Sequence, residues 1–120
     1  MKTYGVILAA GDSTRFDEEV NKLFYKVNGK ELVLYPVETF LDNNEIDEVL
    51  LVSSKSNKSA FEKLLKKHQS VSIILGGDSR QESEYCALQY LQDKATDNCF
   101  IVIHDAARSF LSSELLTSLV

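Results

Sequence analysis

Apolar and polar positions follow one another along the chain in blocks that predict strands and helices in turn. Short, mainly apolar runs predict buried strands over residues 4–10, 48–53, 71–75 and 99–103. Apolar residues recur at helical spacing over 31–42, 59–68 and 80–92, and a last helix is expected to begin near Ser112. This order predicts an α/β fold with a mostly parallel, Rossmann-like sheet that carries helices on both faces.

The helical pattern also predicts which side chains face the sheet and where one helix ends. Pro36 is compatible with the first turn of its helix, and Asn43-Asn44 is expected to end that helix. The residues expected to point inward are Ala60, Phe61, Leu64 and Leu65 in the second helix and Ala87, Leu88 and Leu91 in the third.

Composition excludes several classes of protein. A chain of 120 residues is about one domain, and its net charge of -5 disfavours general binding to nucleic acid or to anionic membranes. No apolar run approaches the roughly 20 residues that span a bilayer, so no membrane partner is expected. Cys86 and Cys99 form no C-x-x-C pair, which indicates reduced thiols in a cytoplasmic protein and argues against a zinc site.

Polar clusters follow three of the expected strands, over residues 9–22, 76–83 and 104–108. The carboxyl ends of parallel strands lie at one edge of an open α/β sheet, and ligands bind along that edge. Three such turns are better support for a binding site than any one of them, because each alone has an ordinary structural explanation.

The first cluster combines small residues with two cations. It matches neither the dinucleotide-binding pattern G-x-G-x-x-G nor a P-loop. Ala9, Ala10 and Gly11 would let the backbone approach a base or a phosphate closely. Arg15 and Lys22 could neutralise the charge that develops during phosphoryl transfer. A surface loop with solvated charges remains the alternative.

The second and third clusters add candidate base and metal contacts. Gly76-Gly77 is expected to leave the strand in a conformation that other residues avoid, and Asp78 or Ser79 could cap the next helix. Exposed backbone groups there could instead select cytosine. Asp105 is a natural Mg²⁺ ligand if it faces a triphosphate, although an Asp at this point could also cap a helix.

Together these segments resemble the 2-C-methyl-D-erythritol 4-phosphate cytidylyltransferase family. The resemblance covers the whole chain, which looks like the N-terminal part of a single cytidylyltransferase domain, with the C-terminal part missing. As given, residues 1–120 are therefore expected to be inactive or weak. The residues that carry the resemblance are Leu8-Ala9-Ala10-Gly11, Arg15, Lys22, Gly76-Gly77, Arg80-Gln81-Glu82-Ser83 and His104-Asp105-Ala106-Ala107-Arg108.

The resemblance implies a nucleotidyltransferase fold and a reaction of non-mevalonate isoprenoid biosynthesis. CMP would move from CTP to 2-C-methyl-D-erythritol 4-phosphate, with release of pyrophosphate, in a homodimeric cytoplasmic enzyme. It implies that Arg15 and Lys22 stabilise the pentavalent α-phosphate and that Asp105 binds Mg²⁺. The implied nucleotide-binding residues are Ala9, Ala10, Gly11, Asp12, Ser13, Gly77, Asp78 and Ser83.

Two other functions stay open at this point. A ribitol-5-phosphate cytidylyltransferase would share the fold and the Arg/Lys pair, but Ala9-Ala10-Gly11 and Ala106-Ala107 favour the methylerythritol branch. A non-catalytic nucleotide-binding module is the other alternative. Departures from the family pattern are Asp12-Ser13-Thr14, Phe16 and Ser109, none of which removes a charge that the chemistry needs.

Overall fold

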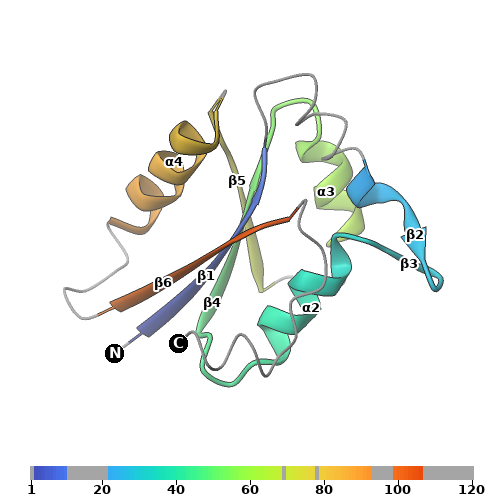
Figure 1. Cartoon of the computed structure of the whole chain (residues 1–120), viewed down its shortest axis with the longest axis horizontal. Coiled ribbons are helices and arrows are strands. Elements are labelled where there is room, and N and C mark those ends of the chain that lie inside the picture. The colour runs from blue at the N-terminus through green and yellow to red at the C-terminus, as the bar shows by residue number, and fades with distance from the viewer. Residues whose placement is uncertain (1, 11–21, 69, 78, 93–98, 107–120) are drawn as a thin grey trace.

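A computed structural model describes residues 2–10, 22–68, 70–77, 79–92 and 99–106. Its centre is a four-stranded parallel sheet with the strand order β5-β4-β1-β6. The strands are β1 (Lys2–Ala9), β4 (Glu48–Ser53), β5 (Val71–Leu75) and β6 (Cys99–Asp105). In Figure 1, β6 and β5 lie at the two edges of this sheet, with β1 and β4 between them. The α/β prediction is confirmed.

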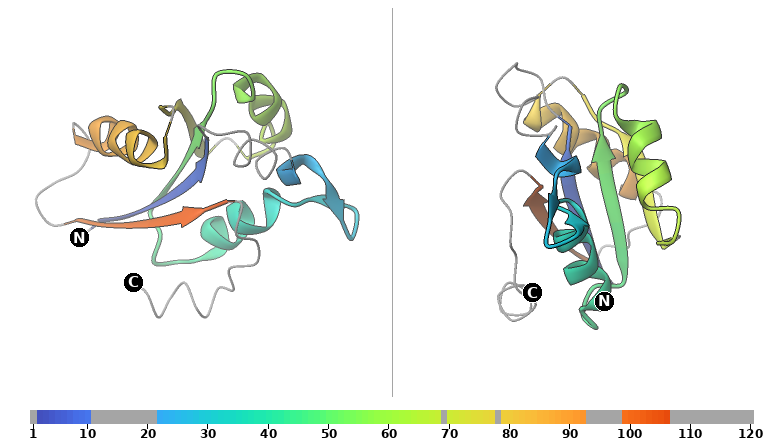
Figure 2. Two further views of the ribbon diagram at one scale, coloured as in Figure 1. Left: turned by 45° about the horizontal axis from the view of Figure 1, so that its top comes forward. Right: turned by 90° about the vertical axis from the view of Figure 1, so that its right-hand side faces the viewer.

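Helices cover both faces of the sheet, as the two further views in Figure 2 also show. Helices α2 (Leu34–Asp42) and α3 (Lys58–Leu64) pack on one face, and α4 (Arg80–Gln92) packs on the other. Successive side chains of a strand point to opposite faces of the sheet, so β1 contributes side chains to the packing on both faces. Ile7 belongs to the buried cluster that contains Phe40 of α2, whereas Leu8 belongs to the cluster that contains Leu91 of α4.

Strand β1 is central and almost wholly buried, which explains its nearly continuous apolar sequence. At Gly5 the helix α2 comes very close to this strand. A Cβ atom at Gly5 would lie 2.5 Å from Cδ2 of Phe40, so the absence of a side chain allows the ring to rest on the backbone.

A short hairpin precedes α2, and the apolar pattern did not predict it. Strands β2 (Lys26–Val27) and β3 (Lys30–Glu31) pair antiparallel around a two-residue turn. Asn28 and Gly29 both have positive φ, 54° and 80°, which is the geometry of a type I′ turn. The signal was present as an Asn-Gly pair. Because the hairpin uses Glu31, α2 begins at Leu34 and not at residue 31 as predicted.

Other boundaries agree closely with the sequence pattern. β4, β5 and α4 have the predicted bounds, and α2 ends at Asp42 with Asn43 as its C-cap. β6 continues two residues beyond the predicted Ile103, and α3 ends at Leu64, before the predicted His68. The predicted loop over 11–21 and the helix expected near Ser112 lie outside the described residues.

Two predicted inward side chains are wrong. Ala60 of α3 is exposed, and Leu88 of α4 is 46% exposed. The stripe of α4 that faces the sheet consists of Ser83, Ala87 and Leu91, which recur every four residues. Small residues at the first two of these positions let the helix lie close to the strands, which turns Leu88 away from the sheet.

Cys86 and Cys99 are both free thiols. Within the described residues, no helix has the length and apolar character needed to cross a membrane.

Candidate functional site

The carboxyl ends of the strands are level with one another. In the sheet register, Ala9 of β1 pairs with Ser53 of β4, and Ser53 pairs with Leu75 of β5. On the other side, Leu8 of β1 pairs with Asp105 of β6, and the amide of Ala106 donates to the carbonyl of Leu8 at 2.9 Å. The described parts of the three polar clusters therefore lie along one edge, as the sequence predicts.

Ala10, Gly76 and Ser83 meet at this edge. A Cβ atom at Gly76 would lie 2.6 Å from Oγ of Ser83 and 3.0 Å from Cβ of Ala10. The amide of Gly76 also donates to the carbonyl of Ser53 at 2.8 Å, which holds the chain against β4 as it leaves β5. This close packing brings the first turn of α4 against the end of β1.

The reason for the Gly76-Gly77 pair differs from the one expected from sequence. Neither residue has a positive φ; among the described glycines only Gly29 does. Lack of space excludes a side chain instead, because a Cβ atom at Gly77 would lie 2.3 Å from Cβ of Glu82. The glycines are needed for the close approach of α4 and not for an unusual backbone conformation.

The small residues at the edge are buried. Ala9 and Ser83 are 0% exposed and Ala10 is 1% exposed. The Ser83 hydroxyl donates to the carbonyl of Gly77 at 3.5 Å, which is a long hydrogen bond. Backbone and side chain alike are therefore covered at Ala9, Ala10 and Ser83, and Ser83 packs beside Gly77.

Helix α4 begins with a side-chain cap. The amide of Glu82 donates to Oγ of Ser79 at 3.0 Å, which confirms Ser79 as one of the two predicted caps. Asp78, the other predicted cap, lies outside the described residues. The cap fixes the first turn of α4 directly after the glycine pair.

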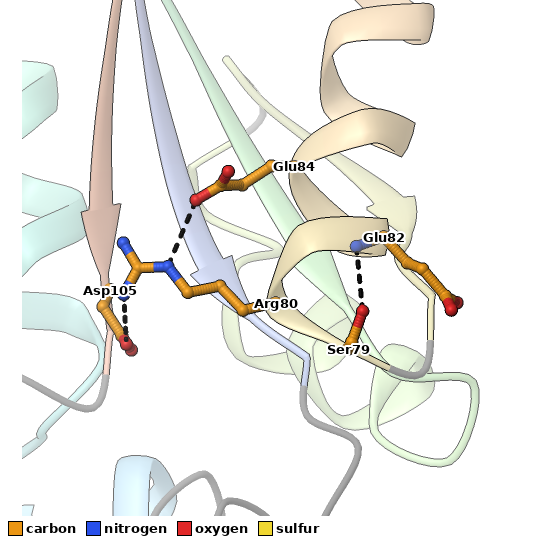
Figure 3. A network of polar contacts seen from close by, with 5 residues as sticks. All are labelled: Ser79, Arg80, Glu82, Glu84 and Asp105. Atoms are coloured by element: carbon orange, nitrogen blue, oxygen red, sulfur yellow. Dashed lines mark hydrogen bonds and ion pairs between the residues drawn. The ribbon is translucent and has the colours of Figure 1, made fainter.

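Arg80 connects this first turn to the end of β6. Its Nη1 donates to Oδ2 of Asp105 at 3.3 Å, and its Nε donates to Oε1 of Glu84 at 3.1 Å. Figure 3 shows the guanidinium lying between these two carboxylates. The side chain of Asp105 is only 11% exposed, compared with 46% for Arg80, so the guanidinium compensates a nearly buried negative charge.

His104, the neighbour of Asp105, belongs to the other face of the sheet. Its ring meets that of Phe40 edge-on, with the ring centroids 6.3 Å apart. This contact with α2 indicates a structural role for His104.

Asp105 suits a divalent cation in its donor chemistry. Mg²⁺ prefers carboxylate oxygens and completes its coordination with water and substrate phosphates. The described residues contain no group of three or more His, Cys, Asp or Glu side chains that could hold a metal by themselves. A single carboxylate such as Asp105 could hold Mg²⁺ only together with other ligands, such as the phosphates of a nucleotide.

Several predicted site residues are not placed by the structure. Gly11, Asp12, Ser13 and Arg15 lie outside the described residues. For Lys22 only the backbone is described; it begins the 3₁₀ helix η1 (Lys22–Phe24). The next residue, Leu23, is fully buried in the same cluster as Ala9, and its carbonyl accepts a hydrogen bond from the amide of Val33.

Arg80 lies at the candidate site, and the sequence pattern gave it no role of its own. A positive charge at the first position of a helix opposes the helix dipole, and this conflict was a signal that Arg80 has an anionic partner elsewhere. One partner, Glu84, is close in sequence, whereas Asp105 is 25 positions away, so only the fold brings Arg80 and Asp105 together.

A parallel sheet covered on both faces, with polar groups and a helix N-terminus at its carboxyl edge, places the chain among the α/β proteins that bind ligands, nucleotides included, at that edge. The comparisons narrow this class. A family model described as "IspD: 2-C-methyl-D-erythritol 4-phosphate cytidylyltransferase" matches residues 4–120. The chain belongs to this family.

Individual relatives agree with this assignment. The chain is 37% identical over 111 residues to 2-C-methyl-D-erythritol 4-phosphate cytidylyltransferase of Petrotoga mobilis, covering 92% of this chain and 49% of the relative. It is also 37% identical to the enzyme of that name from Clostridium perfringens (strain SM101 / Type A), covering 96% of this chain and 51% of the relative. The chain thus spans about half the length of these curated relatives.

Solved structures share the fold over the same extent. The 4-diphosphocytidyl-2C-methyl-D-erythritol synthase of Anaerococcus prevotii superposes with a TM-score of 0.74 at 26% identity, covering 98% of this chain and 48% of that one. The bifunctional IspDF of Campylobacter jejuni gives a TM-score of 0.75 at 30% identity, covering 98% of this chain and 29% of that one.

Proposed function

We propose that this chain is the CTP-binding part of a cytidylyltransferase that transfers CMP from CTP to 2-C-methyl-D-erythritol 4-phosphate and releases pyrophosphate. The observation that carries the proposal is the family match over residues 4–120, which includes all three polar clusters. The level strand ends and the Arg80–Asp105 contact, both at the edge where α/β proteins bind nucleotides, support it.

The proposed reaction needs positioning and charge neutralisation more than a protein nucleophile. The acceptor phosphate attacks the α-phosphate of CTP, and the bond to pyrophosphate breaks. Arg15 and Lys22 carry fixed positive charges that would stabilise the pentavalent α-phosphate. Both are therefore proposed to act mainly in the transition state.

The nucleotide is proposed to lie over the small residues at the edge. Contacts to cytosine and ribose are proposed for Ala9, Ala10, Gly77, Asp78 and Ser83. Gly11, Asp12 and Ser13 are proposed to surround the phosphates with amides and hydroxyls.

Asp105 is proposed to hold Mg²⁺ together with the phosphates of CTP. Bound Mg²⁺ would neutralise triphosphate charge and polarise the phosphoryl oxygens. The part played by the chain is to keep a carboxylate at the end of β6, beside the end of β1, where the register places it. A homodimer and a cytoplasmic location are proposed from the family resemblance alone.

The test is a turnover assay of the protein at its natural length with CTP, Mg²⁺ and either polyol phosphate. We expect the CDP-alcohol and pyrophosphate to form with 2-C-methyl-D-erythritol 4-phosphate. Turnover of ribitol 5-phosphate alone would assign the protein to the other branch of cytidylyltransferases.

A binding measurement separates an enzyme from a nucleotide-binding module. Calorimetric titration with CTP should show binding that Mg²⁺ strengthens and that Arg15→Ala weakens. CTP binding that is indifferent to both, together with no turnover of either polyol phosphate, would indicate a non-catalytic module.

A further inference from the structure

Arg80 carries a positive charge at a position where the surrounding backbone disfavours one. It is the first residue of α4, where the helix dipole favours negative groups. Two carboxylates compensate for this: Glu84 lies one turn further along the same helix, at 3.1 Å from Nε, and Asp105 lies at the end of β6, at 3.3 Å from Nη1. The guanidinium is thus shared between its own helix and the sheet.

The two ends of the Arg80–Asp105 contact differ in burial. The Asp105 side chain is 11% exposed and the Arg80 side chain is 46% exposed. A nearly buried carboxylate requires a cation nearby, whereas a half-exposed arginine on a flexible stem can turn toward water at little cost. Asp105 therefore needs a cation more than Arg80 needs Asp105.

Glu84 is a second anionic partner for the guanidinium of Arg80. Its side chain is 34% exposed and already accepts a hydrogen bond from Nε. If Arg80 leaves Asp105, the guanidinium keeps an anionic partner at i+4 on its own helix. Release of Asp105 is therefore a rotation of one side chain and does not require α4 or β6 to move.

We propose that Arg80 competes with a divalent cation for the carboxylate of Asp105 and so sets how tightly Asp105 binds that cation. Arg80 neutralises Asp105 when no metal is bound, and Asp105 exchanges the guanidinium for the metal when a nucleotide brings one. The inference rests on the proposed function, because it requires Asp105 to be a metal ligand.

Three substitutions are expected to affect Mg²⁺ binding by Asp105 in three different ways. Arg80→Gln removes the competing charge, so Asp105 should bind Mg²⁺ more tightly. Arg80→Lys keeps the charge and should stay close to the unsubstituted protein. Glu84→Gln leaves Arg80 with one carboxylate fewer, so Arg80 should hold Asp105 more strongly and Mg²⁺ binding should weaken.

The experiment is a titration of the protein at its natural length with MgCl₂ at constant ionic strength, with and without CTP. Carboxyl ¹³C resonances of labelled aspartate are followed by NMR, and Asp105 is assigned from the signal that disappears in Asp105→Asn. The expected Mg²⁺ midpoint falls about threefold or more in Arg80→Gln, which is a modest effect in keeping with a partly exposed ion pair. It rises in Glu84→Gln.

Each outcome decides between the possibilities. A midpoint that stays the same in Arg80→Gln, or that falls in Glu84→Gln, overturns the competition while leaving Asp105 as a ligand. An Asp105 resonance that never responds to Mg²⁺, with or without CTP, overturns both the inference and the metal role of Asp105. Neither result removes cytidylyl transfer, which the turnover assay measures separately.

Discussion

The guanidinium of Arg80 donates a hydrogen bond to Asp105 across 25 positions of sequence. The contact ties the first residue of α4, which follows one edge strand, to the last residue of the opposite edge strand. In Figure 3 this contact passes across the end of the central strand β1. The ion pair couples the start of α4 to the end of β6, so a change of charge at Arg80 is expected to alter the electrostatic environment of Asp105, and the reverse.

Substitution of Lys22 by Ala is expected to lower kcat by about 100-fold or more in the protein at its natural length, with a modest change in CTP affinity. The reason is that a contact made mainly with the pentavalent phosphate stabilises the transition state and not the ground state. Steady-state kinetics with CTP and the polyol phosphate measure both quantities.

Lys26→Ala is the matched control for Lys22, because Lys26 is an exposed lysine on β2, four positions further along. Its kinetics should be close to those of the unsubstituted protein. A rise in KM for CTP at constant kcat in Lys22→Ala would instead make Lys22 a ground-state binding residue.

Substitution of Asp105 by Ala is expected to raise the Mg²⁺ concentration needed for half-maximal turnover sharply, since one oxygen ligand is lost. The measurement is turnover against Mg²⁺ at fixed CTP. Asp42→Ala, at the exposed end of α2, serves as the control for loss of a carboxylate. If the magnesium curve of Asp105→Ala coincided with that of the control, Asp105 would not be a ligand.

Substitution of Gly76 by Ala is expected to destabilise the fold by about 1–3 kcal/mol, as is usual for an added methyl group in a packed region. The new Cβ would lie 2.6 Å from Oγ of Ser83 and 2.7 Å from Cγ1 of Val52. Urea unfolding measures the loss. Adding Ser83→Ala should restore part of it, and a Gly76→Ala protein as stable as the original would show that α4 can move away freely.

The ion pair of Lys30 with Glu38 gives a prediction for alkaline pH. Lys30 Nζ donates to Glu38 at 2.7 Å, and this hydrogen bond raises the pKa of Lys30 above its ordinary value of 10.5. A group whose pKa is raised by folding contributes stability below its unfolded pKa and loses it as the pH rises through the folded pKa. The contribution should thus be constant at neutral pH and vanish in strong alkali.

A double-mutant cycle with Lys30→Met and Glu38→Gln isolates this pair. Urea unfolding of the four proteins should show a favourable coupling near neutral pH that decreases once the pH passes 10.5. Coupling that grew with pH over that range would contradict the assignment.

Prediction from sequence succeeded where an element has a clear start and end. Strands β4 and β5 have their predicted bounds because their apolar runs end at polar residues or glycine, and helix α4 begins where the Ser79 cap was expected. The prediction that Leu88 points toward the sheet was wrong, because it relied on the hydrophobicity of that residue alone. The helix faces the sheet through Ser83 and Ala87, whose small size matters more than their hydrophobicity.

The described parts of the three polar clusters lie at one edge of the sheet, as the sequence predicts, and family membership is confirmed. The contacts between them could not be predicted. The Arg80–Asp105 ion pair depends on strand order, which brings β6 beside β1, and no local pattern encodes that order. The roles of Arg15, Lys22 and the other proposed nucleotide contacts stay predictions.

His104 and Asp105 are adjacent in β6 and serve opposite layers of the molecule, one touching Phe40 of α2 and the other Arg80 of α4. Loss or gain of one residue upstream within the strand would exchange the two. Loss of a residue would place the carboxylate at the position beside Phe40, and gain of a residue would place the imidazole where Asp105 now lies. The two layers that β6 serves therefore constrain the length of the strand as well as its residues.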